Sequence, residues 1–190
     1  MTNDVHIRDE APADTAAIAR VTVAAFRTLE ISQYTEQFII EALRAADALT
    51  VSLVAEAAGR VIGHVAFSPI AISDGTADWV GLGPLSVLPA RQRKGIGTAL
   101  VHEGLARLKG RDARGCCVVG HPEYYRRFGF ENPLGLVLEG VPPEVFLALP
   151  FGGPTPQGTV SFHAAFTAAG PDDDAGRPDE ASRDDAPAGG

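Results

Sequence analysis

The residues most able to do chemistry lie in segment 85–100, where an apolar stretch is followed by a short basic turn and an amphipathic stretch. This order predicts a helix that begins directly at the end of a strand. The first N–H groups of a helix have no carbonyl one turn earlier to bind, and together with the helix dipole they favour an anion. Gly95 and Gly97 remove side chains where a phosphate would approach the backbone. Positive charge around the same point comes from Arg91, Arg93 and Lys94. The segment therefore predicts a site for a phosphate or pyrophosphate group.

Three phosphate-binding patterns can be compared with this turn. A Walker loop has a lysine directly after its last glycine, but Thr98 stands at that position. A dinucleotide fingerprint has a third glycine where this chain has Leu100. The pattern Gln/Arg-x-x-Gly-x-Gly is filled by Gln92-Arg93-Lys94-Gly95-Ile96-Gly97. This turn resembles the pyrophosphate loop of the GNAT superfamily of N-acetyltransferases, which bind acetyl-coenzyme A (acetyl-CoA). The alternative is a strand-to-helix turn whose basic residues only face water.

A second segment strengthens the resemblance. Residues 124–130, Tyr-Tyr-Arg-Arg-Phe-Gly-Phe, look like the Tyr-x-Lys/Arg-x-Gly-Phe element of these enzymes, and Tyr125 falls on its tyrosine. The interval from Gly97 to Tyr125 leaves room for a helix, a loop and one strand, as that fold requires. Three further stretches, 63–69, 79–81 and 127–130, are similar to the YhbS-like branch of bacterial acetyltransferases. The resemblance covers residues 5–166 and is weakest just before Tyr125.

The resemblance implies a role for each part of the first motif. The pantetheine arm of acetyl-CoA would exchange strand-like hydrogen bonds with the backbone of residues 85–87, and the pyrophosphate would meet the turn. The donor-binding residues predicted in this way are Leu85, Ser86, Val87, Gln92, Arg93, Lys94, Gly95, Ile96, Gly97 and Thr98. A backbone N–H near Val87 would stabilise the oxyanion that forms at the thioester. Ser86 is not predicted to be a nucleophile, because no Gly-x-Ser-x-Gly elbow surrounds it.

Acyl transfer to an amine also needs an acid and a base. Tyr125 is the candidate acid that protonates the leaving thiolate, because a phenol keeps its proton at neutral pH; the alternative is that it only packs beneath the donor. The amine must lose a proton, since a free alkylamine has a pKa of about 10. His64 is a candidate base because histidine titrates in the right range. The base stays open, and the other candidates are Glu36, Asp78, His121 and Glu123.

The hydrophobic pattern predicts the elements that would position these residues. Strands are expected over residues 5–8, 49–55, 61–67, 79–88, 115–120, 134–138 and 158–164. Helices are expected over residues 12–27, 35–46, 95–108 and 122–127, and residues 150–156 are expected to be a long connection. Pro69 is expected to end the strand before it, because proline cannot extend a ladder. Gly81, Gly83 and Pro84 interrupt the strand 79–88 and indicate either a bulge or the close approach of another backbone.

These elements and the resemblance together predict an α/β (α+β) fold. The expected architecture is the GNAT acyl-CoA N-acyltransferase fold, a mixed, mostly antiparallel central sheet flanked by helices. The resemblance implies that the bulge splays two strands into a V-shaped cleft. One domain over residues 1–168 is expected to precede a disordered, acidic Ala/Gly/Pro tail over residues 169–190. The tail carries −5 of the formal net charge of −8.

Composition points to a protein of the cytoplasm without membrane or nucleic-acid partners. The chain has no apolar run of the length of a membrane span and no basic-then-apolar signal pattern at its start. It is acidic and lacks basic stripes with interleaved aromatic residues. Cys116 and Cys117 are adjacent, which suits neither an unstrained mutual disulfide nor a zinc site. We expect them to be small buried residues, and we expect no metal.

The predicted function is transfer of an acetyl group from acetyl-CoA to a primary amine of a small molecule or peptide, by direct attack in a ternary complex. A non-catalytic acyl-CoA-binding module is the second hypothesis. A dinucleotide-binding redox domain is disfavoured, because the stretch 49–88 lacks crossover helices. Residues 28–34 and 142–157 are expected to shape the acceptor pocket. The sequence sets neither the acceptor nor the choice between monomer and homodimer.

Overall fold

The computed structural model describes residues 5–27 and 35–169, and the predicted acceptor segment 28–34 and nearly all of the predicted tail lie outside these ranges. The strands are β1 (Val5–Asp9), β2 (Val51–Ala57), β3 (Arg60–Ile72), β4 (Trp79–Val87), β5 (Gly115–Val119), β6 (Leu136–Val137), β7 (Phe146–Pro150) and β8 (Gly158–Phe162). The α-helices are α1 (Thr15–Phe26), α2 (Glu36–Ala45), α3 (Ile96–Lys109) and α4 (Pro122–Tyr125). Short 3-10 segments are η1 (Pro12–Asp14), η2 (Pro89–Arg91), η3 (Arg126–Phe128), η4 (Pro143–Val145) and η5 (Ala164–Thr167).

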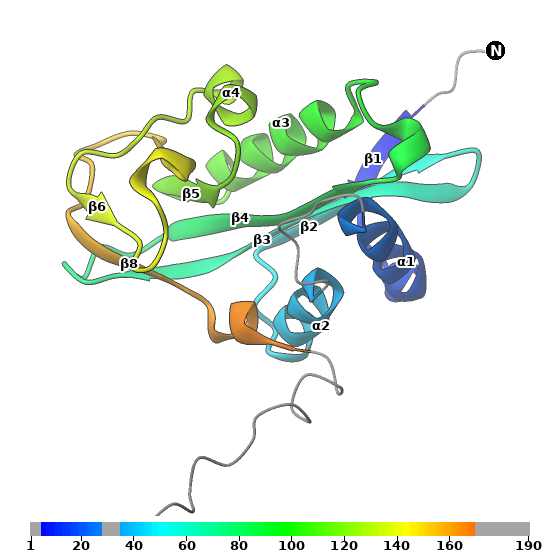
Figure 1. Cartoon of the computed structure of the whole chain (residues 1–190), viewed down its shortest axis with the longest axis horizontal. Helices are drawn as coiled ribbons and strands as arrows, with labels where there is room; N and C mark the ends of the chain where they lie inside the picture. The colour runs from blue at the N-terminus through cyan, green and yellow to red at the C-terminus, as the bar shows by residue number, and fades with distance from the viewer. Residues whose placement is uncertain (1–4, 28–34, 170–190) are drawn as a thin grey trace, which may run out of the picture.

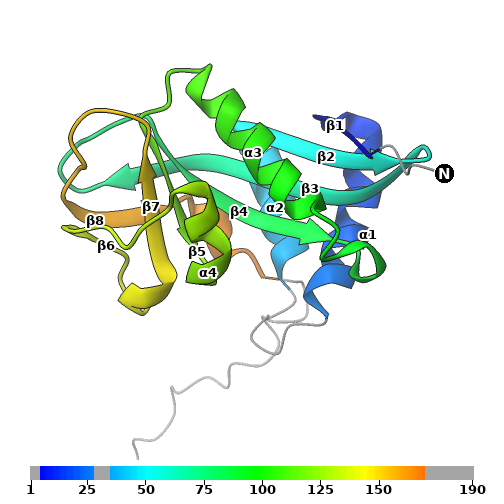
Figure 2. The same cartoon turned by 90° about the horizontal axis from the view of Figure 1, so that it is seen from above.

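The strands form one mixed and mostly antiparallel sheet, as predicted. Its order is β1-β2-β3-β4-β5-β7, with β8 pairing the far end of β3 and β6 pairing β8. The pairs β4–β5 and β6–β8 are parallel, and the other pairs are antiparallel. Figure 2 shows β4 and β5 at the centre of the molecule, between the β2–β3 side and the β7–β8 side.

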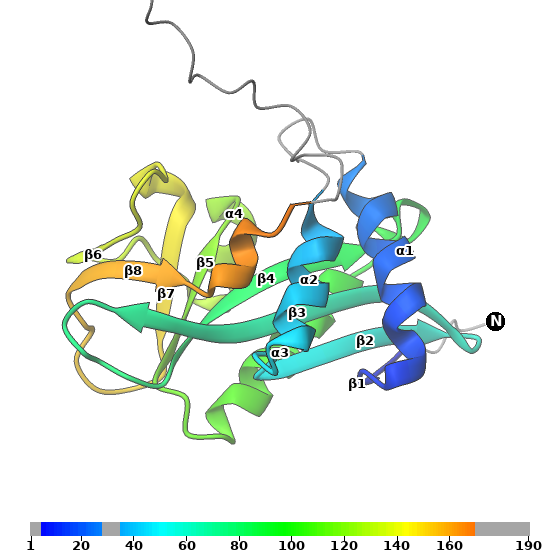
Figure 3. The ribbon, with the colours of Figure 1, turned by 90° about the horizontal axis from the view of Figure 1, so that it is seen from below.

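Helices cover both faces of the sheet. In Figure 1, α3 and α4 lie on one side and α1 and α2 on the other, and Figure 3 shows α1 and α2 crossing β2, β3 and β4. The main core lies between the sheet and α3, where Phe67, Leu53, Leu100 and Leu108 have no exposed surface. The sheet therefore presents a separate surface to each pair of helices, and the two surfaces carry different side chains.

The expected bulge lies where β4 leaves β5. The register between β3 and β4 shifts between Val65 and Phe67, because two β4 residues, Gly83 and Pro84, stand opposite one β3 residue. Gly83 has φ 147°, which few other residues tolerate. The β4–β5 ladder ends at the pair Leu82–Val118, although β4 continues to Val87. Within the described residues, the last part of β4, after Leu82, is therefore paired only with β3.

Two predictions about the strands were wrong. β3 does not end at Pro69 but continues to Ile72. Pro69 is tolerated because the β2 ladder ends at Phe67 and the β8 ladder begins at Ile70, so no hydrogen bond is needed between them on that side. The strand β7 was not predicted, because its residues precede a Pro/Gly-rich piece that was assigned to a connection.

The two adjacent cysteines are placed as predicted. Cys116 and Cys117 are buried and free, and burial raises the pKa of the Cys117 thiol to about 12. Among the described helices, none is long and apolar enough to cross a membrane.

Candidate active site

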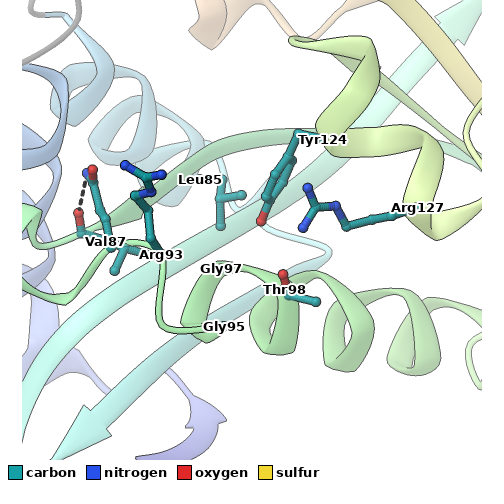
Figure 4. Close-up of a pocket in the computed structure, with 9 residues that line it drawn as sticks. Leu85, Val87, Arg93, Gly95, Gly97, Thr98, Tyr124 and Arg127 are labelled. Atoms are coloured by element: carbon teal, nitrogen blue, oxygen red, sulfur yellow. Dashed lines mark hydrogen bonds between the residues drawn. The ribbon is translucent and has the colours of Figure 1, made fainter.

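A cavity of about 510 Å³ opens beside the unpaired end of β4. Its walls come from β4, the turn after it, the first turn of α3, and the α4–η3 segment (Figure 4). The residues that line it are Leu85, Val87, Gln92, Arg93, Gly95, Gly97, Thr98, Tyr124 and Arg127. The two motifs found in the sequence therefore meet in space across one cavity.

Within the described residues, the N–H groups of residues 93–98, at the end of the turn between β4 and α3, donate to no other backbone group. The Gln92 side chain donates through Nε2 to the carbonyl oxygen of Val87 at 3.0 Å, which is the dashed line in Figure 4. Arg93 and Gly95 have φ values of 60° and 82°, both in the left-handed region. The first intrahelical bond runs from the Ala99 N–H to the Gly95 carbonyl at 2.9 Å. The N–H groups at the start of α3, beside the cavity, therefore form a candidate anion cradle.

Gly97 permits the close approach of three elements. A Cβ atom at this position would lie 2.8 Å from the Tyr124 hydroxyl and 3.7 Å from a Val87 methyl group. Any side chain here would enter the cavity between α3 and β4. An alanine here would need the Tyr124 side chain to shift, whereas the φ of Gly97 lies outside the left-handed region.

Two arginines bring positive charge to the cavity from opposite walls. Arg93 projects from the turn, and Arg127 projects from η3 with its guanidinium carbon 4.7 Å from the centre of the Tyr124 ring. Arg127 was not predicted as a site residue, although it occupies the Lys/Arg position of the Tyr-x-Lys/Arg-x-Gly-Phe element. The signal was present in the motif but was not used.

The other predicted donor residues are placed as follows. Lys94 is exposed and donates to the Ala90 carbonyl at 3.1 Å. Ile96 points into the main core. Ser86 is 2% exposed and faces the α1 side of the sheet, where its hydroxyl lies 3.2 Å from that of Thr22. Seven of the ten predicted donor residues line the cavity, while the backbone of Ser86 remains on the strand that borders it.

The two adjacent tyrosines occupy different places. Tyr124 is the one that lines the cavity, with its hydroxyl beside Gly97; burial raises its pKa, and a hydrogen bond with Thr98 partly offsets this. Tyr125 is 8% exposed, and burial raises its pKa well above the usual value. The Tyr125 ring packs over Gly120, directly after β5, where β4 and β5 separate. Tyr124 therefore lines the cavity, while Tyr125 belongs to the main core near the end of the β4–β5 ladder.

His64 lies on the α1–α2 face of the sheet and has no exposed surface. Its Nε2 atom is 2.8 Å from the Ser52 hydroxyl and 3.4 Å from a Glu10 carboxylate oxygen. Burial lowers the pKa of His64, while Glu10 acts in the opposite direction. The His64 ring belongs to β3, the strand next to the one that borders the cavity, since His64 pairs with Ser86 of β4.

The remaining base candidates are spread around the molecule. Asp78 is exposed and directly precedes β4, at the end opposite the cavity. His121 and Glu123 are exposed around the start of α4. Glu36 is the first residue of α2. None of these side chains lines the described cavity.

Comparisons with known proteins agree on one family. The model of the acetyltransferase (GNAT) domain matches residues 49–132. The uncharacterized N-acetyltransferase YhbS of Escherichia coli K12 is 36% identical over 126 residues, which are 66% of this chain and 72% of YhbS.

Two solved structures have a similar backbone. A GNAT family acetyltransferase from Brucella melitensis, in complex with acetyl-CoA, is 52% identical with a TM-score of 0.78, covering 86% of this chain and 99% of that one. Escherichia coli YhbS, in complex with CoA, is 30% identical with a TM-score of 0.81, covering 90% and 96%. Both relatives were thus solved with a coenzyme A ligand.

Proposed function

The chain belongs to the GNAT acetyltransferase family, and from that premise we propose that it transfers an acetyl group from acetyl-CoA to a primary amine of a small molecule or peptide. The observation that carries the proposal is the cavity between the unpaired end of β4 and the first turn of α3. Its two ends suit the two chemically different parts of acetyl-CoA. The coenzyme A ligands of the two solved relatives support the same donor.

The charged part of the donor fits the α3 end of the cavity. The pyrophosphate accepts hydrogen bonds from the N–H groups between Arg93 and Thr98, where the helix dipole adds to the attraction. Arg93 and Arg127 supply two guanidinium groups. The planar set of N–H donors in a guanidinium group suits phosphate oxygens better than the compact ammonium group of a lysine does. The pantetheine arm then lies along the edge of β4 and exchanges strand-like hydrogen bonds with residues 85–87.

The thioester reaches the gap between β4 and β5. There the amine nitrogen attacks the thioester carbonyl carbon, and a backbone N–H near Val87 stabilises the oxyanion. The carbon–sulfur bond breaks as the tetrahedral intermediate collapses. The products are an N-acetylated amine and coenzyme A, after the thiolate has taken a proton and the amine has lost one.

We assign the proton donated to the thiolate to Tyr125. Its ring packs at Gly120, beside the gap, and its raised pKa keeps the phenol protonated at neutral pH. Tyr124 lies against Gly97 and Thr98, and its role is to shape the wall that holds the donor. In this proposal, Tyr125 takes part in the chemistry and Tyr124 helps to bind the donor.

Amine-dependent release of thiol is the test that separates an enzyme from a binding module. The protein is mixed with acetyl-CoA and a panel of alkylamines and arylalkylamines, and free coenzyme A is followed with a thiol reagent. The proposal expects at least one amine to raise the rate well above the rate with acetyl-CoA alone. Tight acetyl-CoA binding with no amine-dependent release across the panel would favour a non-catalytic module.

The cytoplasm stays the predicted location of the protein.

A further inference from the structure

Gly83 and Val119 lie where β4 and β5 separate, on the face of the sheet away from α3. The last pair of that ladder is Leu82–Val118, and both side chains belong to the main core on the α3 side. Side chains alternate along a strand, so the next position on each strand is directed to the opposite face. Val119 accordingly pairs with Phe146, whose side chain belongs to the core cluster of that opposite face. The cavity proposed for acetyl-CoA is lined by α3, so Gly83 and Val119 border the separation from the other side.

Phe166 of η5 brings an aromatic ring to the same place. A Cβ atom at Gly83 would lie 3.9 Å from this ring, so the backbone of β4 faces it without an intervening side chain. The Phe166 ring meets that of Phe162 of β8 edge to face, with ring centres 5.0 Å apart. It also packs against a buried cluster that contains Ile39 and Leu43 of α2, and Figure 3 shows η5, in orange, beside α2. Contacts with β8 and α2 therefore hold the ring next to β4.

The side chains around this point are apolar and reach solvent. Val119 is 43% exposed, and Gly83 and Phe166 are partly exposed. His163, the titratable residue nearest to Phe166 in the sequence, caps η5, because its Nδ1 atom accepts from the Ala165 N–H at 3.1 Å. A single exposed valine is ordinary on a protein surface. Here, however, it adjoins an aromatic ring and a bare strand, and we call Gly83, Val119 and Phe166 the apolar rim.

We propose that the apolar rim binds the first carbon atoms of the acceptor, so that the acceptor is a primary amine on an alkyl or arylalkyl group. This inference rests on the proposed acetyl transfer and narrows its acceptor. The donor occupies the α3 side of the sheet, and the amine reaches the thioester from the side of the rim. Its carbon atoms contact Val119 and the Phe166 ring. Each methylene group removed from water there strengthens binding, whereas a hydroxyl or a second charge would lose water without gaining a partner.

Amines of equal size test the proposal in the coenzyme A release assay at saturating acetyl-CoA. n-Butylamine, linear propanolamine, trimethylenediamine and glycinamide have the same number of non-hydrogen atoms, and glycinamide represents a peptide N-terminus. At equal concentrations of the neutral amine, kcat/KM is expected to be at least about tenfold higher for n-butylamine than for the other three. From ethylamine to n-butylamine it is expected to rise about fourfold for each methylene group.

The outcomes of this assay separate the rim from the reaction itself. Polar amines turned over as well as n-butylamine, or better, would overturn the inference and leave the proposed acetyl transfer standing. Tight acetyl-CoA binding without turnover of any amine would remove both proposals.

Val119→Asp places a carboxylate on the rim. We expect kcat/KM for n-butylamine to fall at least about tenfold and the preference to move to trimethylenediamine, whose second ammonium group can pair with the carboxylate. The KM for acetyl-CoA is expected to stay within about twofold, because the donor lies on the other side of the sheet. The matched control is Val137→Asp, which alters another exposed valine, in β6 and outside the rim, and is expected to keep the wild-type preference. A wild-type preference in Val119→Asp would overturn the proposal.

Phe166→Leu keeps an apolar side chain and removes the ring. The variant is expected to lower kcat/KM for phenethylamine about fivefold more than for n-hexylamine, because only the first amine can stack on the ring. A ring that merely supports the fold would change both values alike. That result would overturn the part of the proposal assigned to Phe166.

Discussion

At the scale of single residues, the cavity that we propose binds acetyl-CoA depends on Gly97, which has no side chain to fill it. Gly97 lies where the first turn of α3, the end of β4 and Tyr124 come together, and a Cβ there would be 2.8 Å from the Tyr124 hydroxyl. The backbone N–H groups beside it face the site proposed for the pyrophosphate. A negative side chain at this position would oppose the donor both by volume and by charge.

Gly97→Glu is therefore expected to weaken acetyl-CoA binding by at least about 100-fold, which corresponds to about 2.7 kcal/mol. Isothermal titration calorimetry measures this directly. The matched control is Ala99→Glu, which places the same carboxylate in the same turn at an exposed position outside the cavity. Equal affinities for Gly97→Glu and Ala99→Glu would contradict the assignment of the turn.

The Tyr124–Tyr125 pair gives a second prediction. Tyr125→Phe removes the proposed acid and is expected to lower kcat by about 100-fold with little change in the KM for acetyl-CoA. Tyr124→Phe removes a hydroxyl from the wall of the cavity and is expected to raise that KM a few-fold while kcat is retained. Steady-state kinetics of both variants check the division, and the opposite pattern would transfer the acid role to Tyr124.

Residue types could be predicted better than their surroundings. The turn at residues 92–97 was predictable from its spacing, because the binding that we propose for it depends on backbone N–H groups and glycines. The environment of His64 could not be predicted, since Glu10 and Ser52 are distant in sequence and meet it only after β2 and β3 pair. Arg127 was predictable, because it occupies the Lys/Arg position of the Tyr-x-Lys/Arg-x-Gly-Phe element, although its place in the cavity depends on how η3 turns after α4.

At the scale of elements, α3 is held against the sheet by a close contact that sets the position of its first turn. A Cβ at Gly104 would lie 2.2 Å from the ring of Phe67, which is fully buried in β3. The helix therefore approaches β3 more closely than an alanine at this position would allow. The position of the anion cradle depends on this packing, because the cradle is the start of the same helix.

Gly104→Ala is expected to destabilise the protein by about 1–3 kcal/mol through overpacking, although alanine favours helix formation by about 1 kcal/mol. Urea unfolding measures the change. Phe67→Leu in the Gly104→Ala background is expected to recover part of the loss, because the smaller side chain vacates the space. A Gly104→Ala variant as stable as the wild type would show that the contact relaxes freely.

The start of α1 is tied to β1 by a carboxylate. Asp14 accepts from the Arg8 guanidinium at 2.6 and 3.0 Å and from the Ala11 N–H at 2.7 Å, and Arg8 in particular lowers the pKa of Asp14. A lowered pKa stabilises the fold above the unfolded value of about 3.9, and this stability is lost as pH falls through the folded value. Asp14→Asn is expected to cost about 2 kcal/mol at neutral pH and progressively less below about pH 4. Urea unfolding of both proteins at neutral and acidic pH checks this, and a pH-independent difference would contradict it.

Elements were predictable where sequence signals were local. Gly83 and Pro84 predicted the bulge, and the helical spacing of apolar residues predicted α3. The run of β3 past Pro69 was not predictable, because it depends on a gap between the β2 and β8 ladders. The strand β7 is defined by its pairing with β5 rather than by a pattern of its own.

At the scale of the whole molecule, charge is distributed unevenly. Residues 171–190 carry seven acidic residues and two arginines, which is −5 of the net charge of −8. Arg93 and Arg127 line the cavity that we propose binds acetyl-CoA, which is an anion. From its charge alone, we expect the tail to oppose acetyl-CoA binding at low ionic strength and less so at high ionic strength.

Deletion of residues 171–190 is expected to leave thermal unfolding unchanged. Acetyl-CoA affinity is expected to rise up to a few-fold at low salt and to match the full chain at high salt, because screening removes the repulsion. Calorimetric titrations at two ionic strengths check this. A loss of affinity or a lower melting temperature in the shortened chain would instead give the tail a structural or binding role.

The most direct test of acetyl transfer by direct attack is a single-turnover reaction with isotope-labelled acetyl-CoA, protein in excess, and the best amine of the panel. Mass spectrometry follows the label in the donor, the protein and the amine. We predict that the label passes from coenzyme A to the amine nitrogen with no labelled protein at any time. Label that stays on coenzyme A, or that appears first on the protein, would contradict the account.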